Sequence, residues 1–144
     1  VNSAMPHHAV DKVCEALNDQ GKAIKGANIL IMGVAYKRDI DDVRESPALD
    51  VMALLLRKGA KLTYHDPFVP TIDGEHWTGG QHMSSVPYSD AAAAAADCVV
   101  VLTDHKAFDY AAIVASARAV VDTRNAVKFA SPKVYKIGAP APRP

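Results

Sequence analysis

The chain has 144 residues, of which 49% are hydrophobic and 22% charged, so it has the size and composition of one globular domain. Its 16 basic and 16 acidic residues cancel, which excludes a global electrostatic attraction to nucleic acid or to an anionic membrane. No apolar run approaches the roughly 18 residues of a membrane span, and we expect no signal peptide. Because Cys14 and Cys98 lack a C-x-x-C spacing, we expect buried, reduced thiols in a cytoplasmic protein.

The apolar pattern alternates between helical and extended periodicity. Helical spacing predicts a first helix over residues 5–19, with one apolar side formed by Ala9, Val13, Ala16 and Leu17. Three further helices are predicted over 47–58, 91–96 and 108–116. Short apolar runs predict strands over 28–32, 61–65, 98–102, 119–122 and 133–137.

The ends of these elements have suitable residues. Ser46 and Pro47 suit the start of the second helix, and Gly59 suits its end. Residues 68–88 are rich in Gly, Pro, Thr and Ser, which indicates an irregular excursion. The proline-rich residues 139–144 predict a disordered tail.

Strands that alternate with helices predict an α/β domain: a mainly parallel sheet of about five or six strands, covered on both faces and preceded by a helix. In such sheets, ligands bind beyond the carboxyl ends of the strands. The unusual polar residues follow four of those ends, in the segments 33–47, 65–67, 103–105 and 123–125.

The segment after the first strand is the most informative one. Connections of this kind usually take two to six residues, whereas this one takes about twelve and carries seven charges, which indicates a functional loop. Gly33 alone is no G-x-G-x-x-G fingerprint, so independent dinucleotide binding is not expected. Lys37, Arg44 and Arg124 provide cations that suit a diphosphate, and Tyr36 provides a ring for a base or sugar.

A structural alternative stays open for the two arginines. They could pair with nearby carboxylates and only hold the loops in place, because structural ion-pair networks are common. The acidic candidates are Asp41, Asp42 and Asp122. The six histidines show no ligand spacing on one element, so no metal site is expected.

The run GVAYKRDIDDVRESPAL, from Gly33 to Leu49, resembles the signature of the UDP-glucose/GDP-mannose dehydrogenase family. The resemblance continues in order through residues 59–60, 64–67, 103–105, 108–109 and 121–125 and covers about residues 2–138. It implies a Rossmann-like three-layer domain over 26–138, the carboxyl-terminal UDP-binding domain of a nucleotide-sugar 6-dehydrogenase. Residues 1–25 then resemble the end of a central interdomain helix that packs a homodimer or larger homo-oligomer.

The family oxidises the C6 hydroxyl of a nucleotide sugar to a uronic acid with NAD⁺. The resemblance implies that a separate amino-terminal domain binds most of the NAD and holds the catalytic cysteine, so no catalytic residue is expected in this chain, and the chain alone should be inactive. It implies that Tyr36, Lys37 and Arg124 bind the UDP-sugar and that Arg44 reaches NAD. The family commonly has phenylalanine at the position of Tyr36.

Three alternatives remain open. The motifs resemble most the bacterial branch that acts on UDP-N-acetylhexosamines, and UDP-glucose is the second candidate. A stand-alone nucleotide-binding regulatory module would show the same strand ends. A flavodoxin-like signalling domain would share the alternating elements but would have an acidic cluster in place of the loop with Lys37.

Overall fold

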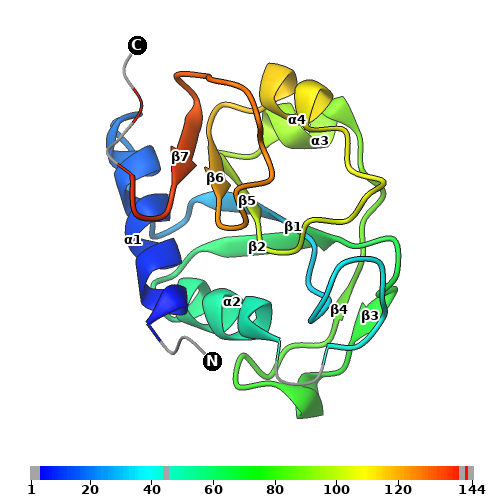
Figure 1. Cartoon of the computed structure of the whole chain (residues 1–144). Coiled ribbons are helices and arrows are strands. Elements are labelled where there is room, and N and C mark those ends of the chain that lie inside the picture. The colour runs from blue at the N-terminus through cyan, green and yellow to red at the C-terminus, as the bar shows by residue number, and fades with distance from the viewer. Residues whose placement is uncertain (1–3, 44–45, 140–141, 143–144) are drawn as a thin grey trace.

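The computed structural model describes residues 4–43, 46–139 and 142 of the chain. One parallel sheet, in the order β2-β1-β5-β6-β7, lies between two layers of helices (Figure 1). Its strands are β1 (Asn28–Met32), β2 (Lys61–His65), β5 (Cys98–Val101), β6 (Val120–Asp122) and β7 (Val134–Lys136). This arrangement confirms the predicted α/β, Rossmann-like class with a helix preceding a five-stranded sheet.

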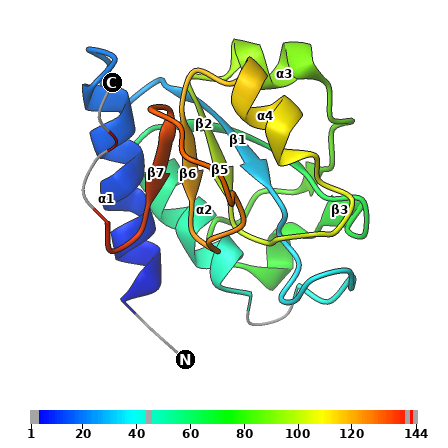
Figure 2. The same cartoon turned by 45° about the horizontal axis from the view of Figure 1, so that its top comes forward.

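The two faces of the sheet carry different pairs of helices (Figure 2). The helices α1 (Met5–Asn18) and α2 (Pro47–Arg57) cover one face, and α3 (Asp90–Ala95) and α4 (Tyr110–Ser116) cover the other. In β1 the side chains alternate between these layers, because successive residues of a strand point to opposite faces. Ile29 and Ile31 pack with α1 and α2, whereas Leu30 and Met32 pack with α3 and α4.

Local signals place the element ends close to where the sequence predicts them, and no end differs by more than two residues. At the start of α2, the Ser46 hydroxyl accepts a hydrogen bond from the Ala48 N–H. Gly59 follows the helix with φ +91°, a conformation that glycine adopts without strain. Caps and periodicity are local properties, so a single sequence reveals them.

The segment 68–88 is more ordered than predicted. It contains a short antiparallel pair, β3 (Thr71–Ile72) with β4 (Met83–Ser84), and a 3₁₀ turn, η1 (Gly74–His76). The side chains of Val69, Ile72 and Trp77 lie buried in the core layer of α1 and α2. These widely spaced anchors do not form a periodic pattern, which is why the sequence indicated only a loop.

From the resemblance to an interdomain helix that packs a homo-oligomer, we expect the apolar side of α1 to be only partly covered within this chain, and this expectation is wrong. Ala9, Val13, Ala16 and Leu17 are each 0% exposed within the single chain, because α1 packs on α2 and across the sheet. The amphipathic pattern shows that one side is buried but does not identify the surface that covers it.

Two smaller findings concern the cysteines and the helices. Cys98 is fully buried and burial raises the pKa of its thiol to about 12, whereas Cys14 is only half-buried; neither forms a disulfide. No helix in the described ranges is long and apolar enough to cross a membrane.

Candidate functional site: the carboxyl edge of the sheet

The loops that follow β1, β2, β5 and β6 meet at the carboxyl edge of the parallel sheet. The chain leaves β1 toward β2 on one side, and β5 lies on the other side of β1. This is a topological switch point, where an open α/β sheet forms its ligand crevice. The loops after β1 and β5 therefore border the candidate site.

Gly33 allows these two loops to approach each other closely. It has φ +86°, and its N–H donates to the His65 carbonyl at 2.9 Å. A Cβ at this position would lie 2.5 Å from the carbonyl oxygen of Thr103. A residue with a side chain would thus meet both an unfavourable φ and a backbone clash.

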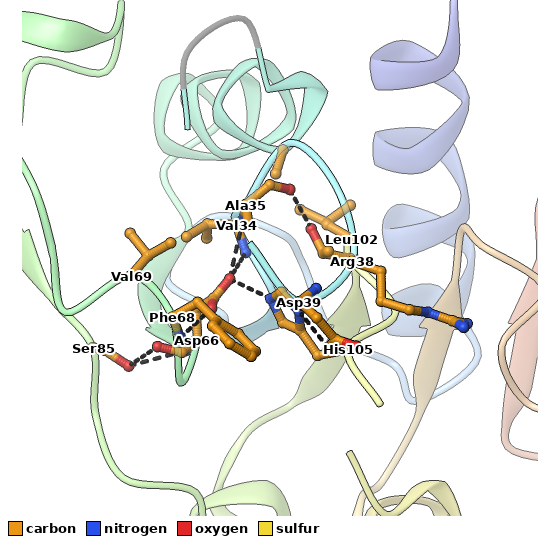
Figure 3. Close-up of polar contacts among 12 residues, drawn as sticks. Val34, Ala35, Arg38, Asp39, Asp66, Phe68, Val69, Ser85, Leu102 and His105 are labelled. Atoms are coloured by element: carbon orange, nitrogen blue, oxygen red, sulfur yellow. Dashed lines mark hydrogen bonds and ion pairs between the residues drawn. The ribbon is translucent and has the colours of Figure 1, made fainter. Parts of the chain in front are cut away.

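The carboxylate of Asp66 holds the start of the loop after β1 (Figure 3). This side chain is 0% exposed, and its Oδ2 accepts the N–H groups of Val34 at 2.8 Å and Ala35 at 3.0 Å. The same oxygen lies 2.8 Å from Nε2 of His105. Asp66 Oδ1 accepts the Phe68 N–H, so both oxygens of the buried carboxylate are satisfied.

His105 joins the loop after β5 to this network. Its side chain is 0% exposed, and its Nδ1 accepts the N–H of Asp39 at 2.8 Å. The rings of Phe68 and Phe108 lie 4.9 Å and 5.3 Å from its centroid and exclude water from the pair. The sequence placed Asp66 and His105 at strand ends but assigned them no ligand role, because no local pattern shows which polar side chain turns inward.

Tyr36 and Lys37 lie on the exposed side of the anchored loop. The Tyr36 ring is 39% exposed, and the Lys37 Nζ lies 5.8 Å from the ring centroid. Across the described part of the chain, Lys37 Nζ has no hydrogen-bond acceptor and no ion-pair partner. Its charge is thus available to a ligand.

Arg124 reaches the same edge from the loop after β6. Its guanidinium donates to the Leu102 carbonyl at 3.3 Å, while its backbone N–H donates to Asp122 Oδ1 at 3.0 Å. The Asp122 carboxylate is occupied mainly by backbone N–H groups, including those of Ala126 and Val127. The guanidinium therefore bonds a carbonyl, and the alternative in which it pairs with Asp122 does not describe its contacts. It also lines a groove of about 570 Å³ between residues 122–125 and 136–139.

Arg38 adds a pairing that the sequence did not identify. Its Nε donates to the Asp104 carbonyl at 2.8 Å, and its Nη2 donates to the Asp104 carboxylate. Burial acts against ionisation of Asp104, but hydrogen bonds from Tyr110 and Arg38 hold its pKa below the usual value, and the nearby Arg124 charge adds to this effect. Arg38 and Arg124 therefore both lie near enough to the Asp104 carboxylate to favour its ionised form.

The structure brings together Tyr36, Lys37 and Arg124 at one edge, as predicted from the strand order. Arg44 lies outside the described residues, so its position is not part of this geometry. Within the described ranges, no group of three His, Cys, Asp or Glu side chains could hold a metal ion. The arrangement suits an anion of extended shape, because its free or carbonyl-bound cations come from separate loops.

Comparison with known proteins supports this interpretation. Residues 30–129 match the family described as "UDP-glucose/GDP-mannose dehydrogenase family, UDP binding domain". The chain is 34% identical over 108 residues to a UDP-N-acetyl-D-mannosamine dehydrogenase of Methanococcus maripaludis, covering 75% of this chain and 22% of the relative. It is 38% identical over 66 residues to a UDP-glucose 6-dehydrogenase of Rickettsia felis, covering 46% and 14%.

The fold agrees with a solved structure as well. A UDP-D-ManNAc dehydrogenase from Pyrococcus horikoshii superimposes with a TM-score of 0.76 at 26% identity. The superposition covers 95% of this chain but only 31% of that protein. The chain thus spans about a fifth to a third of the length of such enzymes.

Proposed function

The chain belongs to the UDP-glucose/GDP-mannose dehydrogenase family, and on that premise we propose that it is the UDP-sugar-binding part of an NAD-dependent nucleotide-sugar 6-dehydrogenase. The complete enzyme would oxidise the C6 hydroxyl of a UDP-sugar to the uronic acid. The observation that carries the proposal concerns Lys37. Its charge has no partner in the described chain, and it lies on a loop whose start is held by the carboxylate of Asp66. Because the loop holds Lys37 at the ligand edge and no protein group among the described residues neutralises its ammonium, the charge is available to a phosphate.

In this proposal each residue has a separate task. Lys37 places a mobile ammonium on the diphosphate, and Arg124 adds a guanidinium fork that can bind two oxygens at once. Tyr36 offers its exposed ring to the uridine or the sugar. These residues bind and orient the substrate; none of them is positioned as a nucleophile.

The sugar is proposed to be a UDP-N-acetylhexosamine, because relatives named for UDP-N-acetyl-D-mannosamine match three quarters of the chain or more. UDP-glucose is the second candidate, since a relative named for it matches a shorter segment of 66 residues at 38% identity. The residues that contact the sugar ring would lie mostly in the remaining part of the enzyme.

NAD is proposed to bind mainly to an amino-terminal domain outside this chain, with Arg44 contributing from this side of the cleft. That domain would also supply the catalytic cysteine. We expect the complete enzyme to be a cytoplasmic homodimer or larger homo-oligomer, without nucleic-acid or membrane partners.

Calorimetric titration of the chain with UDP, uridine, UDP-N-acetylmannosamine and UDP-glucose tests the binding role. We expect UDP to bind more tightly than uridine and its affinity to fall as salt is raised, because the diphosphate meets exposed cations. Equal binding of UDP and uridine, or no binding of UDP, would contradict the proposal. The chain alone should form no NADH with NAD⁺ and either UDP-sugar; NADH formation by the pure chain would contradict its role as a binding part only.

A further inference from the structure

We propose that His105 is a positioning residue of the UDP site, an inference that rests on the function proposed above. Its neutral imidazole, with the proton on Nε2, ties the loop after β1 to the ends of β2 and β5. Through this contact it holds Tyr36 and Lys37 at the ligand edge.

The two ligand-facing residues lie between two anchor points of the loop. On one side, Asp66 accepts the N–H groups of Val34 and Ala35. On the other side, the N–H of Asp39 is bound by Nδ1 of His105 (Figure 3). Only residues 36–38 span the interval, so the His105 bond limits where Lys37 can lie.

The hydrogen bonds determine which nitrogen of His105 carries the proton. A backbone N–H can only donate, so Nδ1, at 2.8 Å from the Asp39 nitrogen, must be the acceptor. Nε2, at 2.8 Å from Asp66 Oδ2, is then the donor. This pattern requires the neutral Nε2–H tautomer, since a proton on Nδ1 would face the Asp39 N–H.

The second anchor point is Asp39, which is held by hydrogen bonds of both its backbone and its side chain. This residue has φ +58°, an uncommon conformation for a residue with a side chain. Its N–H is bound by His105, and its Oδ1 accepts the N–H of Lys106 at 3.0 Å. Backbone strain of this kind persists where surrounding contacts over-determine it, and it is frequent at ligand-binding loops.

Two carboxylates and two aromatic rings surround the imidazole of His105. The carboxylate of Asp66 bonds Nε2, and the carboxylate of Asp39 lies 3.5 Å from Nδ1. The rings of Phe68 and Phe108 cover the imidazole. The imidazole is 0% exposed, so removal of its Nδ1 acceptor takes away the protein partner that holds the Asp39 N–H in this position.

Two substitutions separate positioning from simple core stability. In His105→Asn the amide oxygen stands near the position of Nδ1 and can still accept the Asp39 N–H, but the donor to Asp66 is lost. In His105→Gln the amide nitrogen reaches the position of Nε2 and can still donate to Asp66, but the acceptor for Asp39 is lost. Each variant removes one bond from the same buried site.

The measurements are UDP affinity by calorimetry, the melting temperature, and hydrogen exchange of the Asp39 amide. We expect His105→Asn to keep the Asp39 amide protected and UDP affinity within about threefold of the parent. We expect His105→Gln to lose the protection of the Asp39 amide and to bind UDP about tenfold more weakly, with a melting temperature similar to that of His105→Asn. Equal loss of affinity in both variants, or unchanged affinity in folded His105→Gln, would overturn the inference.

A fourth measurement needs neither a variant nor a ligand. A ¹⁵N spectrum of the imidazole in the unsubstituted chain should show a protonated Nε2 and an unprotonated, hydrogen-bonded Nδ1. A proton on Nδ1 would overturn the inference even if UDP binds. Failure of the unsubstituted chain to bind UDP would instead contradict the proposed function. Amide protection and the ¹⁵N spectrum would still test whether His105 Nδ1 accepts the Asp39 N–H.

Discussion

Replacement of Lys37 by alanine separates ligand binding from folding, because this side chain has almost no structural task. Its Nζ contacts only the Tyr36 ring at 5.8 Å and has no acceptor in the described chain. The free energy of unfolding should therefore change by no more than about 0.5 kcal/mol, as for a surface substitution. A charge-assisted hydrogen bond to the diphosphate is worth about 1.5–3 kcal/mol, so UDP should bind roughly 10- to 150-fold more weakly.

The assay is calorimetric titration with UDP, paired with urea unfolding of the same samples. Lys61→Ala is the matched control, because it removes the same charge from an exposed position at the amino end of β2, on the opposite edge of the sheet. The control should leave UDP affinity unchanged. If Lys37→Ala bound UDP as the parent does, or lost stability instead of affinity, the reasoning that the free ammonium serves the ligand would be refuted.

Three further outcomes follow from the geometry. Arg124→Lys should weaken UDP binding about as much as Arg124→Ala, because a lysine cannot form the guanidinium fork; calorimetry that shows full affinity in the lysine variant would contradict this. Gly33→Ala should cost about 2–4 kcal/mol of unfolding free energy, whereas Gly21→Ala, which has φ +71° but open space around it, should cost only about 1–2 kcal/mol in urea titrations. Hydrogen bonds from the Lys22 ammonium and the Asn28 N–H lower the pKa of Asp97, so ionised Asp97 stabilises the fold above its unfolded-state pKa, and this stabilisation is lost as the pH falls through the folded-state pKa. Asp97→Asn should therefore be less stable than the parent near neutral pH. Urea titrations at falling pH should show that this difference in unfolding free energy vanishes.

Local signals account for most of what the sequence predicted correctly. The strands β1 and β2 have the predicted bounds because short apolar runs between turn residues are local, and α2 begins at Pro47 after Ser46 for the same reason. The location of the candidate site at the carboxyl edge of the sheet was also predicted, since a parallel sheet brings the carboxyl ends of its strands together. Tyr36, Lys37 and Arg124 could thus be assigned to one site from their place after the strands.

Contacts between distant segments account for what the sequence did not reveal. Asp66 and His105 are polar residues in turn-like surroundings, and only the packed structure shows that both turn inward and bond each other. Periodicity correctly showed that α1 has one apolar side, but it carries no information about the surface that covers this side, which is α2 together with the sheet. Trp77 escaped notice because a single aromatic side chain in a loop forms no pattern.

The burial of α1 also bears on how the chain folds as it is synthesised. Within this domain the helix is synthesised before the sheet, yet it is bound to the strand that comes last. Lys12 Nζ donates to the Ala139 carbonyl 127 positions later, and the Tyr135 hydroxyl donates to Asp19 across 116 positions. Contacts of such sequence separation close large loops and form late. Until β7 emerges, the apolar side of α1 is incompletely covered, so nascent chains that end before residue 133 should be prone to aggregation.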